Sequence, residues 1–114
     1  MEECLFCRIV AGEIPSEKVY EDDMVYGFRD IEPKAPVHVL FVPKKHLSSV
    51  MDAQGEDARY QVAVMDAARK YAGQAGLDKS GFRLVVNTGQ DGGQTVPHLH
   101  VHLLGGRSLG WPPG

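Results

Sequence analysis

The pattern of apolar and polar positions predicts five short strands. Each is either a run of alternating apolar and polar residues or a short apolar run between turn residues. Asp22–Asp23 separates the first two as a tight turn, and Pro36 and Pro43 bracket the third, as prolines do at strand ends. The expected strands are Lys18–Glu21, Met24–Arg29, Val37–Val42, Phe82–Val86 and Leu99–Leu104.

Two other segments have the three- and four-residue spacing of a helix. The first is a short helix that Gly12 and Pro15 end, with one apolar side made of Leu5, Phe6, Ile9 and Val10. The second is the only long helix, from about Gly55 to Gln74, closed by Gly76. Its apolar stripe is narrow and rich in alanine, and we expect it to pack in the core rather than against a partner. The stripe consists of Ala58, Val62, Met65, Arg69 and Ala72.

The order of these elements indicates the fold class. Few helices accompany five strands, and strand and helix do not alternate regularly, which favours an α+β fold with an antiparallel sheet. The chain has 114 residues, about the size of one domain. It contains no internal repeat, low-complexity tract or linker, so we expect a single domain over residues 1–114.

Composition and charge narrow the functional classes. Hydrophobic residues make up 43% and charged residues 24% of the chain, which is typical of a globular protein and argues against disorder. The net charge is −3 and no basic cluster exceeds Lys44–Lys45, so we expect no DNA or RNA partner, only a small nucleotide at most. No apolar run approaches the ~18 residues of a membrane helix, and the acidic start differs from a secretory signal. We therefore expect a soluble, cytoplasmic protein without a membrane partner.

The most informative segment is the last expected strand, where histidine alternates with apolar residues. Side chains two apart on a strand share a face, so His98, His100 and His102 form one row. Burying three imidazoles without partners is costly, and a merely solvated face has no need of histidine. Two chemical interpretations compete. Either histidines of the row chelate zinc in an open hydrolytic site, or one is a nucleophile whose neighbours hold phosphate oxygens and move protons.

The loop before this row favours the second interpretation. Asn87–Thr95 is rich in glycine and in hydrogen-bond donors. Such a loop can surround an anionic group with backbone N–H groups. An ordinary hairpin loop, with glycines at positive φ, is the simpler alternative, but it does not account for the neighbouring row of imidazoles.

Cys4 and Cys7 are the only cysteines, and they form a C-x-x-C pair. A disulfide across so short a loop would add little stability, so redox chemistry and metal binding are the alternatives to consider. The pair alone does not decide between them, because an isolated C-x-x-C is weak evidence for a metal.

The histidine row and its surroundings resemble a known family. The run His98-Leu99-His100-Val101-His102-Leu103-Leu104 matches the His-φ-His-φ-His-φ-φ motif of the histidine-triad (HIT) superfamily, in which φ is apolar. Other segments are similar to the Hint branch, so the resemblance runs from about Leu5 to Gly114. They are Phe28-Arg29-Asp30-Ile31, Ala35-Pro36-Val37-His38, Pro43-Lys44-Lys45-His46, Gly92-Gly93-Gln94-Thr95-Val96, Gly105-Gly106-Arg107 and Trp111-Pro112-Pro113-Gly114.

The resemblance implies a HIT fold and an activity. Hint-like proteins hydrolyse nucleoside phosphoramidates and transfer nucleotidyl groups, often those of purine nucleosides. By correspondence, His100 is the nucleophile that forms a nucleotidyl-histidine, from which water releases the nucleoside monophosphate. An imidazole suits this role because it is partly neutral at cellular pH. His102 donates to a phosphate oxygen, with the Gly93 backbone and the Thr95 hydroxyl as further donors, and His38 orients the row and relays protons.

The same correspondence places the substrate. Asp30 takes the ribose hydroxyls, and Asn87 and Gln94 complete the polar contacts. Two chains are expected to join their sheets in a ten-stranded homodimer, and Trp111 in the C-terminal tail is expected to reach the departing amine in the partner's site. The residues expected to enclose the purine base are Phe6, Ile9, Phe28 and Ile31.

The resemblance also bears on the cysteines. Some bacterial members of the branch hold zinc with a C-x-x-C pair and two histidines. The matching positions are Cys4, Cys7, His46 and His98, which would make a closed, structural site. In that case His98 positions the strand instead of taking part in proton chemistry with the rest of the row. The hydrolysis itself is expected to need no metal, since imidazoles and backbone amides stabilise the charge.

Two alternative functions stay open. A dinucleoside polyphosphate hydrolase, as in the Fhit branch, commonly has glutamine at the last position of the row. His102 stands there in this chain, which favours the phosphoramidase. A nucleotide-binding regulatory protein with little turnover is the alternative from another class.

Overall fold

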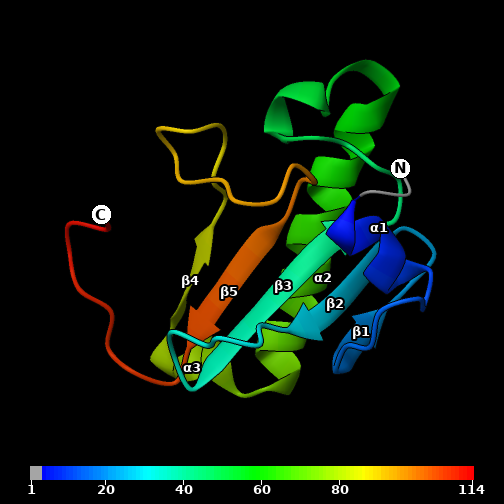
Figure 1. Ribbon diagram of the computed structural model, residues 1–114. Helices are drawn as coiled ribbons and strands as arrows, with labels where there is room; N and C mark the ends of the chain where they lie inside the picture. The colour runs from blue at the N-terminus through cyan, green and yellow to red at the C-terminus, as the bar shows by residue number, and fades with distance from the viewer. Residues whose placement is uncertain (1–3) are drawn as a thin grey trace.

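Five antiparallel strands form one sheet in the computed structural model, which describes residues 4–114 (Figure 1). The strand order is β1-β2-β3-β5-β4, with β3 in the centre. This confirms the predicted α+β class and the five-stranded antiparallel sheet, and the first four strands lie within one residue of their predicted bounds. The strands are β1 (Lys18–Glu21), β2 (Val25–Arg29), β3 (Val37–Pro43), β4 (Phe82–Val85) and β5 (Val101–Gly105).

The α-helices of the described residues are α1 (Leu5–Val10), α2 (Arg59–Gln74) and α3 (Leu77–Ser80). The long helix begins later than predicted, because Gly55–Ala58 forms a 3-10 turn that leads into it. Gly76, with φ 76°, stops α2 in a left-handed conformation that suits glycine. The short α3 was not expected, since four residues carry too little periodicity to be recognised. No helix within residues 4–114 has the length and apolar character needed to cross a membrane.

The alternation of side chains along β3 decides what each face of the sheet contacts. Val39 and Phe41 point to the face that α2 covers, where they join the larger core cluster. Leu40 and Val42 point to the opposite face and pack with α1 in a second cluster. In Figure 1, α2 therefore lies behind the sheet and α1 in front of it. His38 shares the α1 side with Leu40, which places the predicted site there.

The predicted apolar stripe of α2 is wrong. Val62 and Met65 are 71% and 45% exposed, and of the five predicted positions only Ala72 is buried. The buried face is nearly all alanine, so its small side chains let α2 approach the sheet closely. Alanine contributes little to a hydrophobic pattern, and the larger Val62 and Met65 concealed the true stripe. The residues of α2 that face the core are Val64, Ala67, Ala68 and Ala72.

The last strand is also shorter than predicted, because it begins at Val101 and not at Leu99. Val101 pairs with Phe41, so Leu99 would stand opposite Pro43 if the ladder continued. Pro43 has no N–H group to donate, and the ladder stops. The N–H of Leu99 instead donates to the carbonyl of Leu47 over 2.6 Å. Only His102 of the histidine row therefore lies on β5.

The C-terminal tail runs away from the sheet after β5 (Figure 1). Nη2 of Arg83 on β4 donates to the carbonyl of Gly110 over 2.6 Å. Trp111 is 83% exposed. Within one chain, the tail thus has a polar tether on β4, while its tryptophan faces solvent.

Candidate active site

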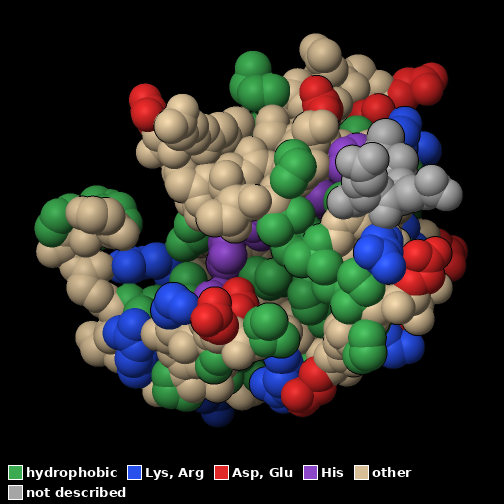
Figure 2. All heavy atoms as spheres, viewed as in Figure 1, with side chains coloured by type: hydrophobic (Ala, Val, Ile, Leu, Met, Phe, Trp, Pro, Cys, Tyr) green, Lys and Arg blue, Asp and Glu red, His purple; other side chains and the backbone are tan. Residues whose placement is uncertain are grey.

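A cavity of about 300 Å³ opens on the α1 side of the sheet. Its walls come from α1, β2, β3, β5 and the connecting segments beside them. Figure 2 shows histidine side chains beside a hydrophobic patch on this side. The cavity therefore combines apolar walls with imidazole groups. The predicted site residues that line it are Phe6, Ile9, Phe28, Asp30, Ile31, Thr95, His100 and His102.

The orientation of the His100 ring is fixed by the backbone. Its Nδ1–H donates to the carbonyl oxygen of His98 over 2.7 Å, so Nε2 keeps its lone pair. The ring is buried and borders the cavity. The ring of Phe6 lies 5.1 Å away and perpendicular to it. His100 therefore presents the basic nitrogen that a nucleophilic imidazole needs.

A chain of hydrogen bonds fixes the protons of His38 and His102. The backbone N–H of Lys34 donates to Nδ1 of His38 over 3.0 Å, so the neutral His38 ring carries its proton on Nε2. That Nε2–H donates to Nδ1 of His102, also over 3.0 Å. The neutral His102 ring then carries its own proton on Nε2. Nε2 of His102 is thus a hydrogen-bond donor, whereas Nε2 of His100 has a lone pair.

Burial keeps these imidazoles neutral. Loss of hydration lowers the pKa of His38 and of His100 below the ordinary value, and it lowers the pKa of His102 to about 4, with the neighbouring rings adding to the effect there. The carboxylate of Asp30 opposes the shift at all three, and its Oδ2 lies 3.5 Å from Nε2 of His38. At neutral pH the rings are uncharged, as the hydrogen-bond chain requires.

Four predicted contacts lie outside the lining of the cavity, namely Asn87, Gly93, Gln94 and Trp111. Gln94 braces the loop instead. Its Nε2 donates to the carbonyls of Ser48 and Val96 over 2.7 and 3.0 Å, and its Oε1 accepts from the N–H of Gly89 over 3.0 Å. Both amide hydrogens are therefore engaged by the backbone. The side chain of Gln94 holds the shape of the donor-rich loop next to the cavity.

The structure brings Cys4, Cys7, His46 and His98 together as four ligand atoms within 4.8 Å of one another. Nδ1 of His98 lies 3.3 Å from Sγ of Cys4, 3.6 Å from Sγ of Cys7 and 3.2 Å from Nδ1 of His46. In a tetrahedral zinc site a nitrogen ligand lies roughly 3.3–3.5 Å from the other nitrogen and from the sulfurs, given bond lengths of about 2.3 Å to sulfur and about 2.0 Å to nitrogen. The donor set therefore fits the closed zinc site that the resemblance implies.

The protons of this cluster also suit a metal. Nε2–H of His98 donates to the carbonyl of Pro43 over 2.9 Å, so Nδ1 offers its lone pair to the cluster, as in other metal-bound histidines. Burial lowers the pKa of His98 to about 4, which keeps the ring neutral. Burial, followed by the adjacent Cys4 thiol, raises the pKa of Cys7 to about 11. A bound metal would therefore displace a thiol proton.

A second group of ligand-type atoms, from Asp30, His38 and His102, does not fit a metal. Nε2 of His38 faces this group, and a metal would need its lone pair there. The backbone N–H of Lys34 keeps that lone pair on Nδ1, so ligation would leave two N–H groups facing each other. His98 points to the cysteines rather than to this group. The geometry therefore disfavours the open zinc site considered for the histidine row.

Several residues that line the cavity were not predicted from the sequence, among them Leu40, Ser16 and Val96. Leu40 had a usable signal, since it stands two residues after His38 on the same strand and pairs with His102. Ser16 and Val96 lie in connecting segments. Their positions depend on the path of the chain between strands, which alternation does not determine.

The antiparallel sheet and the row of histidines, of which His98 and His100 are buried, define an α+β protein with a histidine site. Comparisons with known proteins give its family. The HIT domain family matches residues 11–109. A HIT-like protein of Synechococcus elongatus is 48% identical over 113 residues, which are 99% of this chain and 98% of that protein. The purine nucleoside phosphoramidase of Escherichia coli is 46% identical over 109 residues, 96% of this chain and 92% of that enzyme. The crystal structure of a HIT family hydrolase from Legionella pneumophila has a TM-score of 0.95 at 47% identity and covers 98% of this chain and 100% of that one. The chain belongs to the HIT domain family.

The brace formed by Gln94 leads to a prediction about stability. Gln94→Met keeps the length of the side chain but leaves the Ser48 and Val96 carbonyls without their donor, so the free energy of unfolding should fall by about 1–2 kcal/mol. Gln90→Met, at an exposed position of the same loop, is the matched control and should change it by less than about 0.5 kcal/mol. Denaturant unfolding measures both. Equal losses at the two positions would contradict the brace.

Proposed function

We propose that the protein hydrolyses nucleoside phosphoramidates through a covalent nucleotidyl-histidine and releases a nucleoside 5′-monophosphate and an amine. The observation that carries this proposal is the His100 ring, whose Nδ1–H is held by the His98 carbonyl and whose Nε2 is free beside the cavity. The relationship to the phosphoramidase of Escherichia coli supports the P–N bond and the purine nucleoside as the substrate class.

In the first step, Nε2 of His100 attacks the α-phosphorus. The P–N bond breaks, its electron pair stays on the departing amine, and the amine takes up one proton from solvent. The Nε2–H of His102 donates to a phosphate oxygen, where negative charge grows. The Thr95 hydroxyl at the cavity is a further donor, whereas the Gly93 N–H already donates to the carbonyl of Gln90 over 3.0 Å. His38 orients His102, since the Lys34 amide holds His38 in one tautomer.

In the second step, water attacks the same phosphorus. The bond to Nε2 of His100 breaks, its electron pair returns to the imidazole, and the water gives up one proton to solvent. The proton taken up by the amine and the proton lost by water balance. Dividing hydrolysis into two displacements keeps the nucleotide bound between them.

The substrate lies with its sugar at Asp30 and its base against apolar walls. One oxygen of Asp30 accepts from the Glu32 N–H over 2.8 Å, which fixes the carboxylate at the edge of the cavity. Its other oxygen is placed to accept from ribose hydroxyls. Phe6 and Phe28 are buried and pack edge to face, 5.5 Å apart. With Ile9 and Ile31, they make the surface on which we place the purine.

We infer that Cys4, Cys7, His46 and His98 hold a structural zinc ion. With four protein ligands the ion has no open position, and its contribution when bound is to folding. The proposed location of the protein is the cytoplasm, where thiol ligands stay reduced. In this proposal Asn87 is a contact on the phosphate side, and Gln94 acts on the phosphate through the loop that it braces.

We also propose a homodimer formed through α2 and β4. Val62, Met65 and Phe82 are exposed and line, with Leu84, a shallow depression of about 590 Å³ that is largely apolar. β4 stands at the end of the strand order, so a second copy can extend the sheet beside it. Trp111, which lies outside its own cavity, would contact the leaving amine in the partner's site.

The nucleophile is tested by His100→Asn. Removing the attacking nitrogen should lower the release of a fluorescent amine from an adenosine phosphoramidate by at least about 1,000-fold. Binding of adenosine monophosphate, measured by calorimetry, should persist and shows that the variant is folded. Turnover close to that of the unmodified protein would remove His100 from the mechanism. An unmodified protein that binds the nucleotide but releases no amine would instead be a binding protein.

The zinc site is tested by metal analysis. The purified protein should carry about one zinc ion per chain, and Cys4→Ser combined with Cys7→Ser should abolish it. Loss of the ion should lower the melting temperature by several degrees while kcat changes by less than about threefold, since the closed site contributes to folding. If chelation abolished all turnover with the fold intact, and zinc restored it, the ion would be catalytic.

The dimer is tested by Met65→Glu. A carboxylate in the middle of the apolar α2–β4 surface would lose its hydration on association, so the variant should sediment as a monomer. Gln74→Glu, at an exposed position of α2 outside the depression, is the control and should leave the mass unchanged. A Met65→Glu variant that keeps the mass of a dimer would place the interface elsewhere.

A further inference from the structure

Helix α1 is tethered to the histidine row by two sulfur atoms. Within residues 4–114, α1 and its N-cap residue Cys4 make hydrogen-bonding contacts with the chain beyond residue 14 only through the cysteines. Sγ of Cys4 lies 3.3 Å from Nδ1 of His98, and Sγ of Cys7 lies 3.3 Å from Nδ1 of His46. Thiol hydrogen bonds are weak. In the metal-free protein, α1 therefore depends chiefly on the packing of its apolar side.

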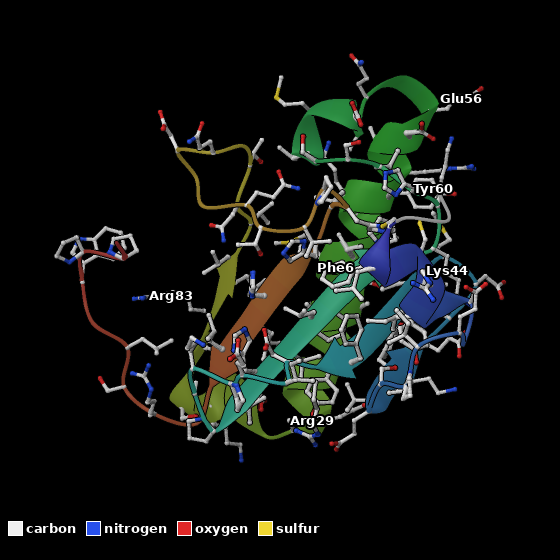
Figure 3. The ribbon with its side chains drawn as sticks, viewed as in Figure 1. Phe6, Arg29, Lys44, Glu56, Tyr60 and Arg83 are labelled. Atoms are coloured by element: carbon white, nitrogen blue, oxygen red, sulfur yellow. The ribbon has the colours of Figure 1, made fainter. Side chains whose placement is uncertain are left out.

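Phe6 lies between the two cysteines in the sequence and forms part of the cavity wall. Its side chain projects from α1 toward the sheet (Figure 3) and is 5% exposed. Its ring stands edge to face with the rings of His100 and Phe28, at 5.1 and 5.5 Å. These contacts keep their geometry only while α1 keeps its position. A movement of α1 would therefore reshape the apolar wall beside His100.

The hydrogen bonds that orient His100 have no partner on α1. The ring of His98 is fully buried and donates to the Pro43 carbonyl, and the carbonyl of His98 accepts from Nδ1 of His100. The Leu99 N–H donates to the Leu47 carbonyl. Pro43 and Leu47, which accept from His98 and Leu99, lie at the end of β3 and in the segment that follows it. Release of the metal should therefore loosen Phe6 more than it disturbs His100.

We propose that a metal ion bound by Cys4, Cys7, His46 and His98 positions Phe6, so that metal loading tightens nucleotide binding while leaving kcat nearly unchanged. This coupling rests on the proposed zinc site and nucleotide substrate, and gives the site a role in affinity beyond its role in folding. Because coupling between two ligands is reciprocal, a bound nucleotide tightens metal binding by the same factor.

The experiment measures both sides of this coupling without turnover. Calorimetry gives the Kd of adenosine monophosphate for the zinc-loaded and the zinc-free protein, at a temperature where circular dichroism shows both to be folded. The zinc-free protein should bind the nucleotide about tenfold more weakly. Competition with a chromophoric chelator gives the Kd of zinc, which saturating nucleotide should lower by the same factor. Equal nucleotide affinity with and without zinc would overturn the coupling.

Two variants separate positioning from general stability. Phe6→Leu retains all four ligands but removes the ring, so its nucleotide affinity should depend on zinc by less than about twofold. Val64→Ala weakens the core on the opposite face of the sheet and should keep the full zinc dependence. Full zinc dependence in Phe6→Leu would overturn the proposal. Failure to take up zinc would refute the metal site, and failure to bind nucleotide in either form would refute the proposed function, so the two are distinguishable.

Discussion

The hydrogen bond from Nδ1 of His100 to the carbonyl of His98 is the contact on which the proposed chemistry depends. It leaves Nε2 of His100 with a lone pair beside the cavity, and it is a backbone contact, so no side chain has to be placed to maintain it. The same residue, His98, sends its ring in another direction, toward Cys4 and Cys7. A catalytic imidazole and a cluster of ligand atoms are therefore joined through one buried residue.

Two groups of ligand-type atoms, one around His98 and the other around His38, differ more clearly in the positions of their protons than in their distances. Both groups bring ligand-type atoms within 4.8 Å of one another. The Pro43 carbonyl accepts a hydrogen bond from Nε2–H of His98, so Nδ1 of that ring keeps its lone pair for a metal. The Lys34 N–H donates to Nδ1 of His38, so the proton of that ring is on Nε2, which is a donor. One backbone carbonyl and one backbone amide thus separate a metal-binding arrangement from a hydrogen-bonding one.

Much of this arrangement could be predicted from the sequence. Alternation along the chain located the strands, and the irregular order of strands and helices indicated an antiparallel sheet. The His-x-His-x-His run located the site, because a period of two places side chains on one face. The buried stripe of α2 was mispredicted, since alanines such as Ala67 and Ala68 carry little pattern. The start of the last strand was mispredicted because it depends on the register with Pro43. The contact of Gln94 with the Ser48 carbonyl joins segments far apart in the sequence and left no local signal.

The stereochemistry of hydrolysis at phosphorus tests the central claim most directly. A phosphoramidate analogue that is chiral at phosphorus, hydrolysed in water labelled with heavy oxygen, reports whether one or two displacements occur. Attack by His100 followed by attack of water inverts the phosphorus twice, so the product should retain the configuration of the substrate. Inversion would mean that water attacks the phosphorus directly, and it would contradict a covalent intermediate on His100.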